Sequence, residues 1–203
     1  MKTSHHLLLG FCVAGASLLT VAGAQAQSNT SKASSGYMDF PSGDSYVGLG
    51  AGRSDFSVGN GIGAFNRDQG DTAYNLSTGH YTHQNFGVEL GYTDFGRIAR
   101  AGGTTKAQGL NLSLIGRAPL GTSFNLLAKL GTTYGQTDVS SAAGSGIVSG
   151  TENGFGWSYG VGAEYLFNPK WSAVVQYDEH QLKFAGDNRD KVGVAYVGVR
   201  YLF

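Results

Sequence analysis

Hydrophobic and polar residues alternate along the last thirteen residues of the chain, positions 191–203. A β-strand places successive side chains on opposite faces, so every second residue shares a face. One face is apolar and ends on aromatic rings: Gly193, Ala195, Val197, Val199, Tyr201 and Phe203. The other face is mixed and carries a charge: Val192, Val194, Tyr196, Gly198, Arg200 and Leu202. A membrane barrel strand has this pattern, because one face meets lipid and the other meets the lumen.

The same alternation recurs through the chain and predicts eight strands. We place them at residues 45–56, 72–82, 86–96, 106–118, 124–138, 154–167, 171–183 and 191–203. The sixth is the clearest, because every odd position from Phe155 to Phe167 is aromatic or aliphatic. The even positions from Gly156 to Glu164 are glycine, serine or glutamate. These lengths are close to the roughly 9–11 residues with which a tilted strand crosses a bilayer.

The lengths of the connections favour one architecture. Long connections at 57–71, 97–105, 139–153 and 184–190 alternate with short ones at 83–85, 119–123 and 168–170. Bacterial membrane barrels have an even strand number, short periplasmic turns and longer external loops. We therefore predict an all-β, eight-stranded antiparallel up-and-down transmembrane barrel with both termini periplasmic. The alternative is a secreted β-sandwich, which has no reason to alternate its loop lengths.

The start of the chain reads as a secretory signal peptide. Residues 1–26 combine a weakly basic start, an apolar run and the cleavage motif Ala24-Gln25-Ala26. The alternative for this segment is a buried N-terminal helix. Residues 27–44 are rich in serine and predict a flexible periplasmic tail, so the barrel domain is expected at 45–203. The only cysteine, Cys12, lies in the signal, and the mature chain can form no disulfide.

Charge and composition help to choose between classes of protein. Removing the signal leaves 13 basic against 14 acidic residues, a balance that does not suggest nucleic-acid binding. After the signal no apolar run approaches the ~20 residues of a membrane helix, as expected for barrel strands whose hydropathy averages out. The chain has 33 glycines but 3 prolines, which suits strands that approach closely in a narrow barrel.

Six charged residues fall on the predicted inner face, three acidic and three basic: Glu89, Arg117, Lys129, Glu164, Asp178 and Arg200. An eight-stranded barrel is just wide enough for side chains to fill it, and buried charges persist when they are paired. We expect a salt-bridge network that plugs the lumen; a gated ion path is the alternative. Large outward aromatic residues predict interfacial girdles: Phe155, Trp157, Tyr165, Phe167 and Trp171.

The sequence gives only weak support for a catalytic site or a metal site. His180, beside Asp178 and Glu179, is the nearest candidate for a Ser/His/acid group, with Ser140 or Ser141 as the serine. His80 and His83 form a histidine pair without a third ligand. We expect no enzyme activity, no cofactor and no metal.

The segment 86–96, Phe-Gly-Val-Glu-Leu-Gly-Tyr-Thr-Asp-Phe-Gly, resembles the OmpA-type transmembrane domain and related small outer-membrane barrels of the porin-like, opacity-type family. Residues 160–177 look like its penultimate hairpin. The ending, with Val199, Tyr201 and Phe203, resembles the signal read by the barrel assembly machinery. The resemblance covers about 45–203 and implies inward charges at Glu89, Lys129 and Glu164.

The family often carries an inward arginine on the seventh strand. Here Val174 and Gln176 stand at the candidate positions, with Arg117 or Arg200 as substitutes. Larger members continue into a peptidoglycan-binding domain, a role that we do not expect here because the chain ends at Phe203.

The resemblance specifies a fold far better than a function. We expect a monomeric, multi-pass outer-membrane protein of a Gram-negative bacterium with a structural role in the cell envelope. Its expected partners are lipid, lipopolysaccharide and the assembly machinery. The alternatives are a surface interaction protein or adhesin that binds an unknown ligand through its external loops, and a narrow gated channel.

Overall fold

The computed structural model describes residues 45–59, 68–186 and 188–203. These residues form eight β-strands: β1 (Ser45–Phe56), β2 (Thr72–His83), β3 (Phe86–Arg100), β4 (Gly103–Pro119), β5 (Phe124–Val139), β6 (Gly150–Asn168), β7 (Trp171–Phe184) and β8 (Asn188–Leu202). No helix in the described ranges is long and apolar enough to cross a bilayer. The predicted signal, the predicted tail and the middle of the first loop lie outside the described residues.

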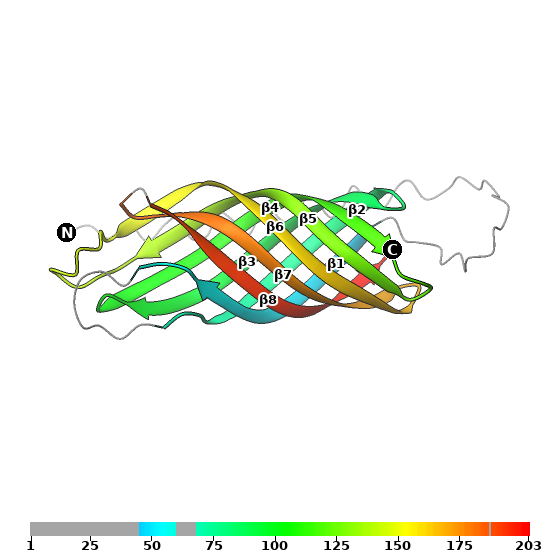
Figure 1. The fold of residues 1–203 in the computed structure, drawn as a ribbon, viewed down its shortest axis with the longest axis horizontal. Coiled ribbons are helices and arrows are strands. Elements are labelled where there is room, and N and C mark those ends of the chain that lie inside the picture. Colours follow the sequence, from blue (N-terminus) through cyan, green and yellow to red (C-terminus); the bar gives the residue numbers. More distant parts are fainter. Residues whose placement is uncertain (1–44, 60–67, 187) are drawn as a thin grey trace. The chain divides into compact units, whose positions relative to one another are not determined.

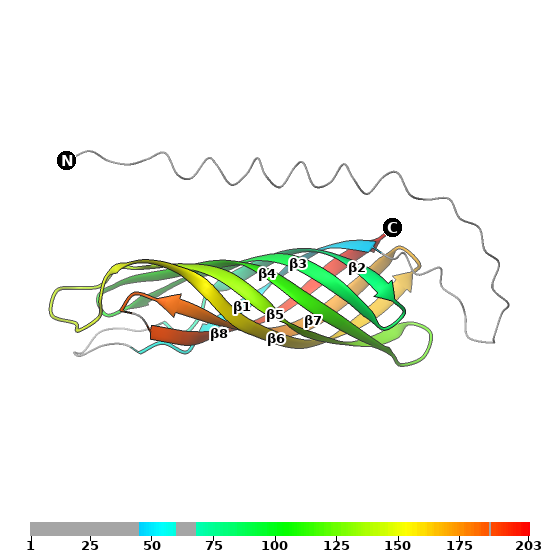
Figure 2. The ribbon, with the colours of Figure 1, turned by 90° about the horizontal axis from the view of Figure 1, so that it is seen from above.

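The strands close into a single barrel in which each strand pairs with its chain neighbours and β1 pairs with β8. Every pairing is antiparallel, which confirms the predicted eight-stranded up-and-down fold (Figure 1). We call the end that carries Ser45, Phe203 and the connections 84–85, 120–123 and 169–170 the turn end. The opposite end, with the connections 57–71, 101–102, 140–149 and 185–187, is the loop end. Figure 2 shows both ends from a second direction.

Two of the four predicted long loops are wrong, because the strands continue through them. Residues 97–105 are mostly strand: β3 runs to Arg100 and β4 starts at Gly103. Ala101 and Gly102, with φ of 51° and 69°, make a two-residue hairpin turn whose left-handed backbone matches the strand twist. Residues 184–190 shrink to the connection 185–187. The predicted loop 139–153 shortens to 140–149, so the loop end is built largely of paired strands.

The outer wall carries the apolar residues that the alternation predicted. Leu112, Leu114 and Val197 are 56%, 66% and 62% exposed, far more than a soluble core permits. The five girdle residues named above are all exposed on this wall. Tyr165, Phe167 and Trp171 lie near the turn end, and Phe155 and Trp157 lie nearer the loop end. The apolar band is therefore bounded by aromatic residues on both sides, as in membrane barrels.

Inside the barrel, glycines on one strand make room for large side chains from another. An added Cβ at Gly79 would lie 2.4 Å from the ring of Tyr46, and one at Gly50 would lie 2.7 Å from the ring of Tyr196. The same arrangement places Gln176 over Gly162 on the neighbouring strand. We call these positions glycine sockets. They explain why a narrow barrel needs so much glycine.

Replacing Gly79 by alanine should therefore lower the free energy of unfolding by about 1–3 kcal/mol, because Tyr46 is fully buried and cannot retreat. Gly91→Ala is the matched control on the next strand, since the nearest atom to its added methyl lies 3.7 Å away. We expect the control to change stability by less than about 1 kcal/mol. Urea titration of both variants in detergent micelles checks this, and equal losses would remove the socket explanation.

Candidate functional site

The lumen gathers five of the six charged residues that the sequence placed on the inner face. Glu89, Lys129, Glu164, Asp178 and Arg200 come from five different strands and are each at most 8% exposed. Alternation alone puts them on one face of their strands. The barrel closure then brings them to one level, where they form a buried charged layer.

Lys129 stands at the centre of this layer. Its Nζ lies 3.0 Å from Glu89 Oε1 and 2.7 Å from Asp178 Oδ2, so one ammonium group binds two carboxylates. The hydroxyl of Tyr196 donates to Asp178 Oδ2 at 3.2 Å. The hydroxyl of Tyr46 donates to Glu89. Hydrogen bonds of this kind are what make a buried ion pair tolerable.

Arg200 links the remaining carboxylate, Glu164, to Glu89. Its Nη2 lies 3.1 Å from Glu89 Oε2, and its Nη1 lies 3.6 Å from Glu164 Oε1. Glu164 also accepts from Asn125 Nδ2 at 2.9 Å and from the hydroxyl of Ser172 at 2.8 Å. Arg200, rather than a residue of the seventh strand, thus supplies the inward guanidinium, and it reaches the seventh strand through Gln176 Oε1 at 3.1 Å.

Arg117 is not part of this layer, contrary to the expected six-membered network. Its guanidinium donates to the carbonyl of Gln84 at 3.1 and 3.0 Å and lies over the Tyr81 ring. Arg117 comes near the end of β4, so the side chain sits at the turn end. Alternation identifies the face of a residue but not its depth, which is why the sequence did not separate Arg117 from the others.

A small cavity accompanies the charged layer. Its volume is about 10 Å³, and its lining includes Gly48, Ser77, Gln176 and Arg200. Among the described residues, Gln176 Nε2 and Arg200 Nη1 have no hydrogen-bond partner. A volume of roughly this size holds about one water molecule, which such donors would bind.

A neutral polar layer lies next to the charged layer and contains His180. The Nδ1 atom of His180 is 2.7 Å from the hydroxyl of Thr133, and its ring meets Phe95 edge-on at 5.1 Å. The candidate serine Ser141 instead donates to the carbonyl of Ile147 at 2.7 Å. Ser140 pairs through its backbone with Thr104. The structure therefore does not assemble the Ser/His/acid group that the sequence raised.

His80 and His83 make separate contacts with other residues. His80 Nδ1 lies 2.9 Å from the hydroxyl of Ser45, and His83 Nδ1 accepts from the backbone N–H of Asn85. Within the described ranges no three histidine, cysteine or acidic side chains are arranged to hold a metal ion.

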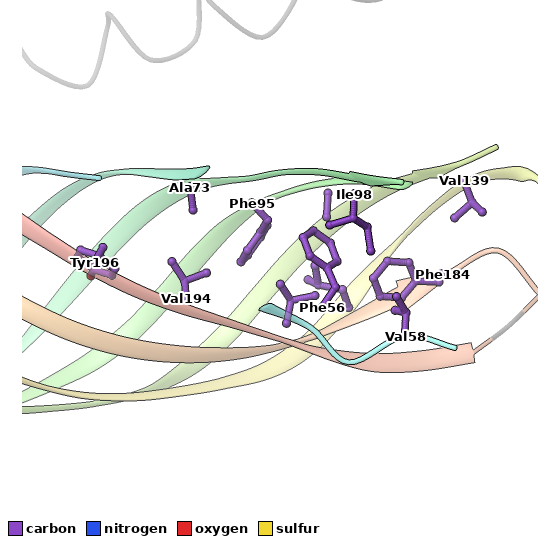
Figure 3. Packing of buried hydrophobic residues seen from close by; sticks show 12 residues of the cluster. Phe56, Val58, Ala73, Phe95, Ile98, Val139, Phe184, Val194 and Tyr196 are labelled. Carbon is purple, nitrogen blue, oxygen red and sulfur yellow. The ribbon is translucent and has the colours of Figure 1, made fainter. Parts of the chain in front are cut away.

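Beyond the polar layers, the loop end is filled by an apolar cluster. Figure 3 shows its residues pointing into the barrel from strands on several sides. Phe56, Phe95, Ile98 and Val192 are completely buried. The cluster consists of Phe56, Val58, Ala73, Phe95, Ile98, Ala107, Val139, Leu182, Phe184, Val192, Val194 and Tyr196. A second cluster closes the turn end: Tyr46, Tyr81, Ile115, Leu127, Val174 and Leu202.

The outer wall becomes polar at the strand positions where the inside becomes apolar. Gln108 accepts from the hydroxyl of Tyr92 and donates to Gln136 at 2.8 Å. Lys191 Nζ lies 2.7 Å from Glu179 on the same wall. The strands thus invert their polarity along their length. Toward the loop end they have the polar outside and apolar inside of a water-soluble β-structure.

Asp71 fastens the loop end where β3 is irregular. The pairing of β3 with β4 shifts between Asp94 and Arg97, and Gly96 has a left-handed φ of 77°. The carboxylate of Asp71 accepts the N–H groups of Arg97 at 2.8 Å and Thr72 at 2.7 Å. These two backbone donors hold the pKa of Asp71 below its usual range.

Comparison with known proteins agrees with this architecture. Residues 14–203 match the family model described as "Outer membrane protein beta-barrel domain". Over 138 residues the chain is 28% identical to outer membrane protein A of Yersinia pseudotuberculosis. That match covers 62% of this chain and 38% of the relative, so the chain spans well under half of the relative's length.

Solved structures with the same fold include three small barrels. Neisserial surface protein A has a TM-score of 0.57 at 15% identity, covering 79% of this chain and 97% of that one. The attachment invasion locus protein Ail of Yersinia pestis has a TM-score of 0.54 at 20% identity, covering 80% and 99%. OprG of Pseudomonas aeruginosa has 0.54 at 18% identity, covering 80% and 96%. At these identities the likeness concerns the fold alone.

Proposed function

Because the chain belongs to the outer-membrane β-barrel family, we propose that it is an integral barrel that conducts no ions and supports the structure of the cell envelope. The observation that carries this proposal is the filled lumen. An apolar cluster at each end encloses the polar and charged layers, and the cavity within the charged layer has room for about one water molecule. In this proposal side chains fill the barrel interior and leave no continuous path for ions.

The apolar outer wall supports the placement in a membrane. We infer that lipid surrounds the band between the aromatic girdles and that lipopolysaccharide surrounds its outer edge. In this proposal the loop end faces the outside of the cell, and the turn end, where both termini of the barrel domain lie, faces the periplasm. The final strand, with Val199, Tyr201 and Phe203, is the segment that we expect the assembly machinery to recognise. The role is non-catalytic in this proposal.

Single-channel recording of the refolded protein in a planar bilayer tests the proposal that the barrel conducts no ions. We expect no discrete openings from the native protein, with insertion confirmed separately by protease protection. Glu164→Ala empties part of the charged layer but leaves both apolar clusters in place, so it should also stay silent. Discrete openings that change with Glu164→Ala would instead support the narrow gated channel.

An envelope assay separates structure from recognition. We expect a deletion strain to leak periplasmic contents, and a barrel whose connection 140–149 is replaced by a short turn to restore the envelope. If the leak persists with that replacement, the loop end has a function beyond structure.

A second candidate function is interaction at the cell surface. It is favoured by the polarity inversion, because the strands continue past the apolar band with an apolar core and a polar exterior. Such a projection presents a rigid surface outside the membrane. Loss of binding to a host or neighbouring cell on altering this end, with envelope integrity unchanged, would favour this candidate.

A further inference from the structure

The barrel is incompletely hydrogen-bonded along one line at the loop end. β6 pairs with β5 as far as Gly150, but its pairing with β7 stops at Ser158 and His180. β7 nevertheless continues to Phe184 in partnership with β8. The part of β6 at residues 150–155 therefore has a strand neighbour on one side only. We call this segment the β6 edge.

The edge is open because β7 turns toward the barrel interior. Leu182 of β7 enters the apolar cluster and packs against β5, where an added Cβ on Gly135 would lie 2.5 Å from it. The hydroxyl of Thr137, also on β5, donates to the carbonyl of Lys183 at 2.6 Å. The end of β7 thus finds partners on β5, two strands away. This part of β6 keeps its ladder with β5 but has no ladder partner on the β7 side.

Two hydrogen bonds identify which backbone groups face the open side. The N–H of Leu166 donates to Ser123, so even-numbered residues of β6 direct their N–H and C=O groups toward β5. The carbonyl of Phe155 accepts from Arg189 Nη1 on β8, so odd-numbered residues face the other way. The backbone groups that face the opening are those of Thr151, Asn153 and Phe155.

Among the described residues, two long basic side chains lie across the opening. Arg189 reaches the carbonyl of Phe155 at 3.1 Å, and Lys183 lies 3.4 Å from Glu152 with both side chains about one-third exposed. Exposed contacts of this kind contribute roughly 0–1 kcal/mol each, so an incoming group can displace them. Beside the opening, Phe155 is 65% exposed, and its ring centroid lies 4.9 Å from that of Tyr134.

We propose that the β6 edge captures an extended segment of another polypeptide by strand addition; this rests on the second candidate function. A row of alternating donors and acceptors at strand spacing is matched by a polypeptide backbone and not by a sugar or a lipid headgroup. An apolar side chain of the guest packs on Phe155 and Tyr134. An acidic side chain binds Arg189 once it leaves the Phe155 carbonyl.

A disulfide that closes the edge tests the proposal. A Cβ at position 154 would lie 3.5 Å from Cβ of Lys183, within the range that a disulfide spans. The variant is Gly154→Cys/Lys183→Cys, with Cys12→Ser in every sample because Cys12 is the only native cysteine. In the oxidised variant β7 is tied to β6 at the distance that the structure already shows, so the two strands cannot separate to admit a guest strand. The same variant after reduction is its matched control, since the sequence is identical.

The probe is a phage-displayed library of random short peptides, selected on the native barrel in lipid nanodiscs. We expect selected peptides to bind the native and reduced proteins at least about tenfold more tightly than the oxidised protein, measured by fluorescence anisotropy. Methylating the N–H of alternate peptide residues should cause a similar loss. Hydrogen exchange should slow at Thr151, Asn153 and Phe155 when peptide binds.

Three outcomes overturn the proposal: no peptide enriched over empty nanodiscs, peptides that bind the oxidised protein equally well, or peptides that tolerate alternate methylation. Binding to a host or neighbouring cell that is the same with and without the disulfide would leave the second candidate function in place and would show that the β6 edge does not carry it. A failure of the first proposed function would appear separately, as current in the planar bilayer.

Discussion

Replacing Arg200 by methionine is expected to lower the free energy of unfolding by about 3–5 kcal/mol. Arg200 is 2% exposed and pairs with both Glu89 and Glu164. Methionine fills similar space but leaves Glu164 as a buried carboxylate without its cation. Urea unfolding in micelles measures the loss through the two tryptophans, Trp157 and Trp171, which are both exposed on the outer wall.

Arg117→Met is the matched control for that experiment. It removes the same kind of side chain from the turn end, where Arg117 meets Gln84 and the Tyr81 ring and contacts no carboxylate of the described residues. We expect a loss of about 1 kcal/mol or less. Equal losses for the two arginines would contradict the assignment of Arg200 to a buried ion-pair network.

A double substitution tests whether the effect of Arg200→Met comes from its pairing with Glu164. Adding Glu164→Gln to Arg200→Met removes the carboxylate that Arg200 balanced, so part of the lost stability should return. We expect the combined loss to fall short of the sum of the single losses by about 0.5–3 kcal/mol, the usual coupling of residues in contact. Additive losses would show that the 3.6 Å pair contributes little.

Replacing Phe95 by alanine is the second change with a large expected effect, a loss of about 3–5 kcal/mol. Phe95 is completely buried in the loop-end cluster and meets His180 edge-on, so the substitution leaves a cavity in a core that cannot collapse. Its measurement is the same urea titration, with the folded fraction checked by unheated gel mobility.

Phe155→Ala is the matched control, because Phe155 is 65% exposed on the outer wall although its residue type is the same. We expect it to cost no more than about 1 kcal/mol, through its contact with Tyr134. If Phe155→Ala lowers the free energy of unfolding as much as Phe95→Ala does, the apolar cluster at the loop end does not contribute to stability as a buried core should.

The sequence predicted the fold and the facing of most lumen residues because both follow from a period of two. Lys129 and Arg200 are inward for the same reason that Leu130 and Val199 are outward. Depth is different. It depends on strand tilt and on the pairing of all eight strands, so the ion-pair partners could not be read from any one segment.

The apolar core of the loop end was missed although its signal was present. Leu182 and Phe184 have the same parity as the inward Asp178 and His180, so they had to face the lumen. The expectation of a polar lumen hid this. In β3 the odd-numbered residues face the lumen as far as Phe95, but after the shift at Gly96 the even-numbered Ile98 and Arg100 face it. A glycine in a strand signals such a shift only weakly.

The glycine sockets also settle a question that alternation leaves open. A slip of one residue between two strands turns every side chain to the wrong face and is rejected at once. A slip of two residues keeps all faces correct, so hydropathy cannot detect it. It would, however, move Tyr46 from Gly79 to stand opposite Ser77 or the buried ring of Tyr81. The sockets therefore disfavour a two-residue slip that the hydropathy pattern alone would allow.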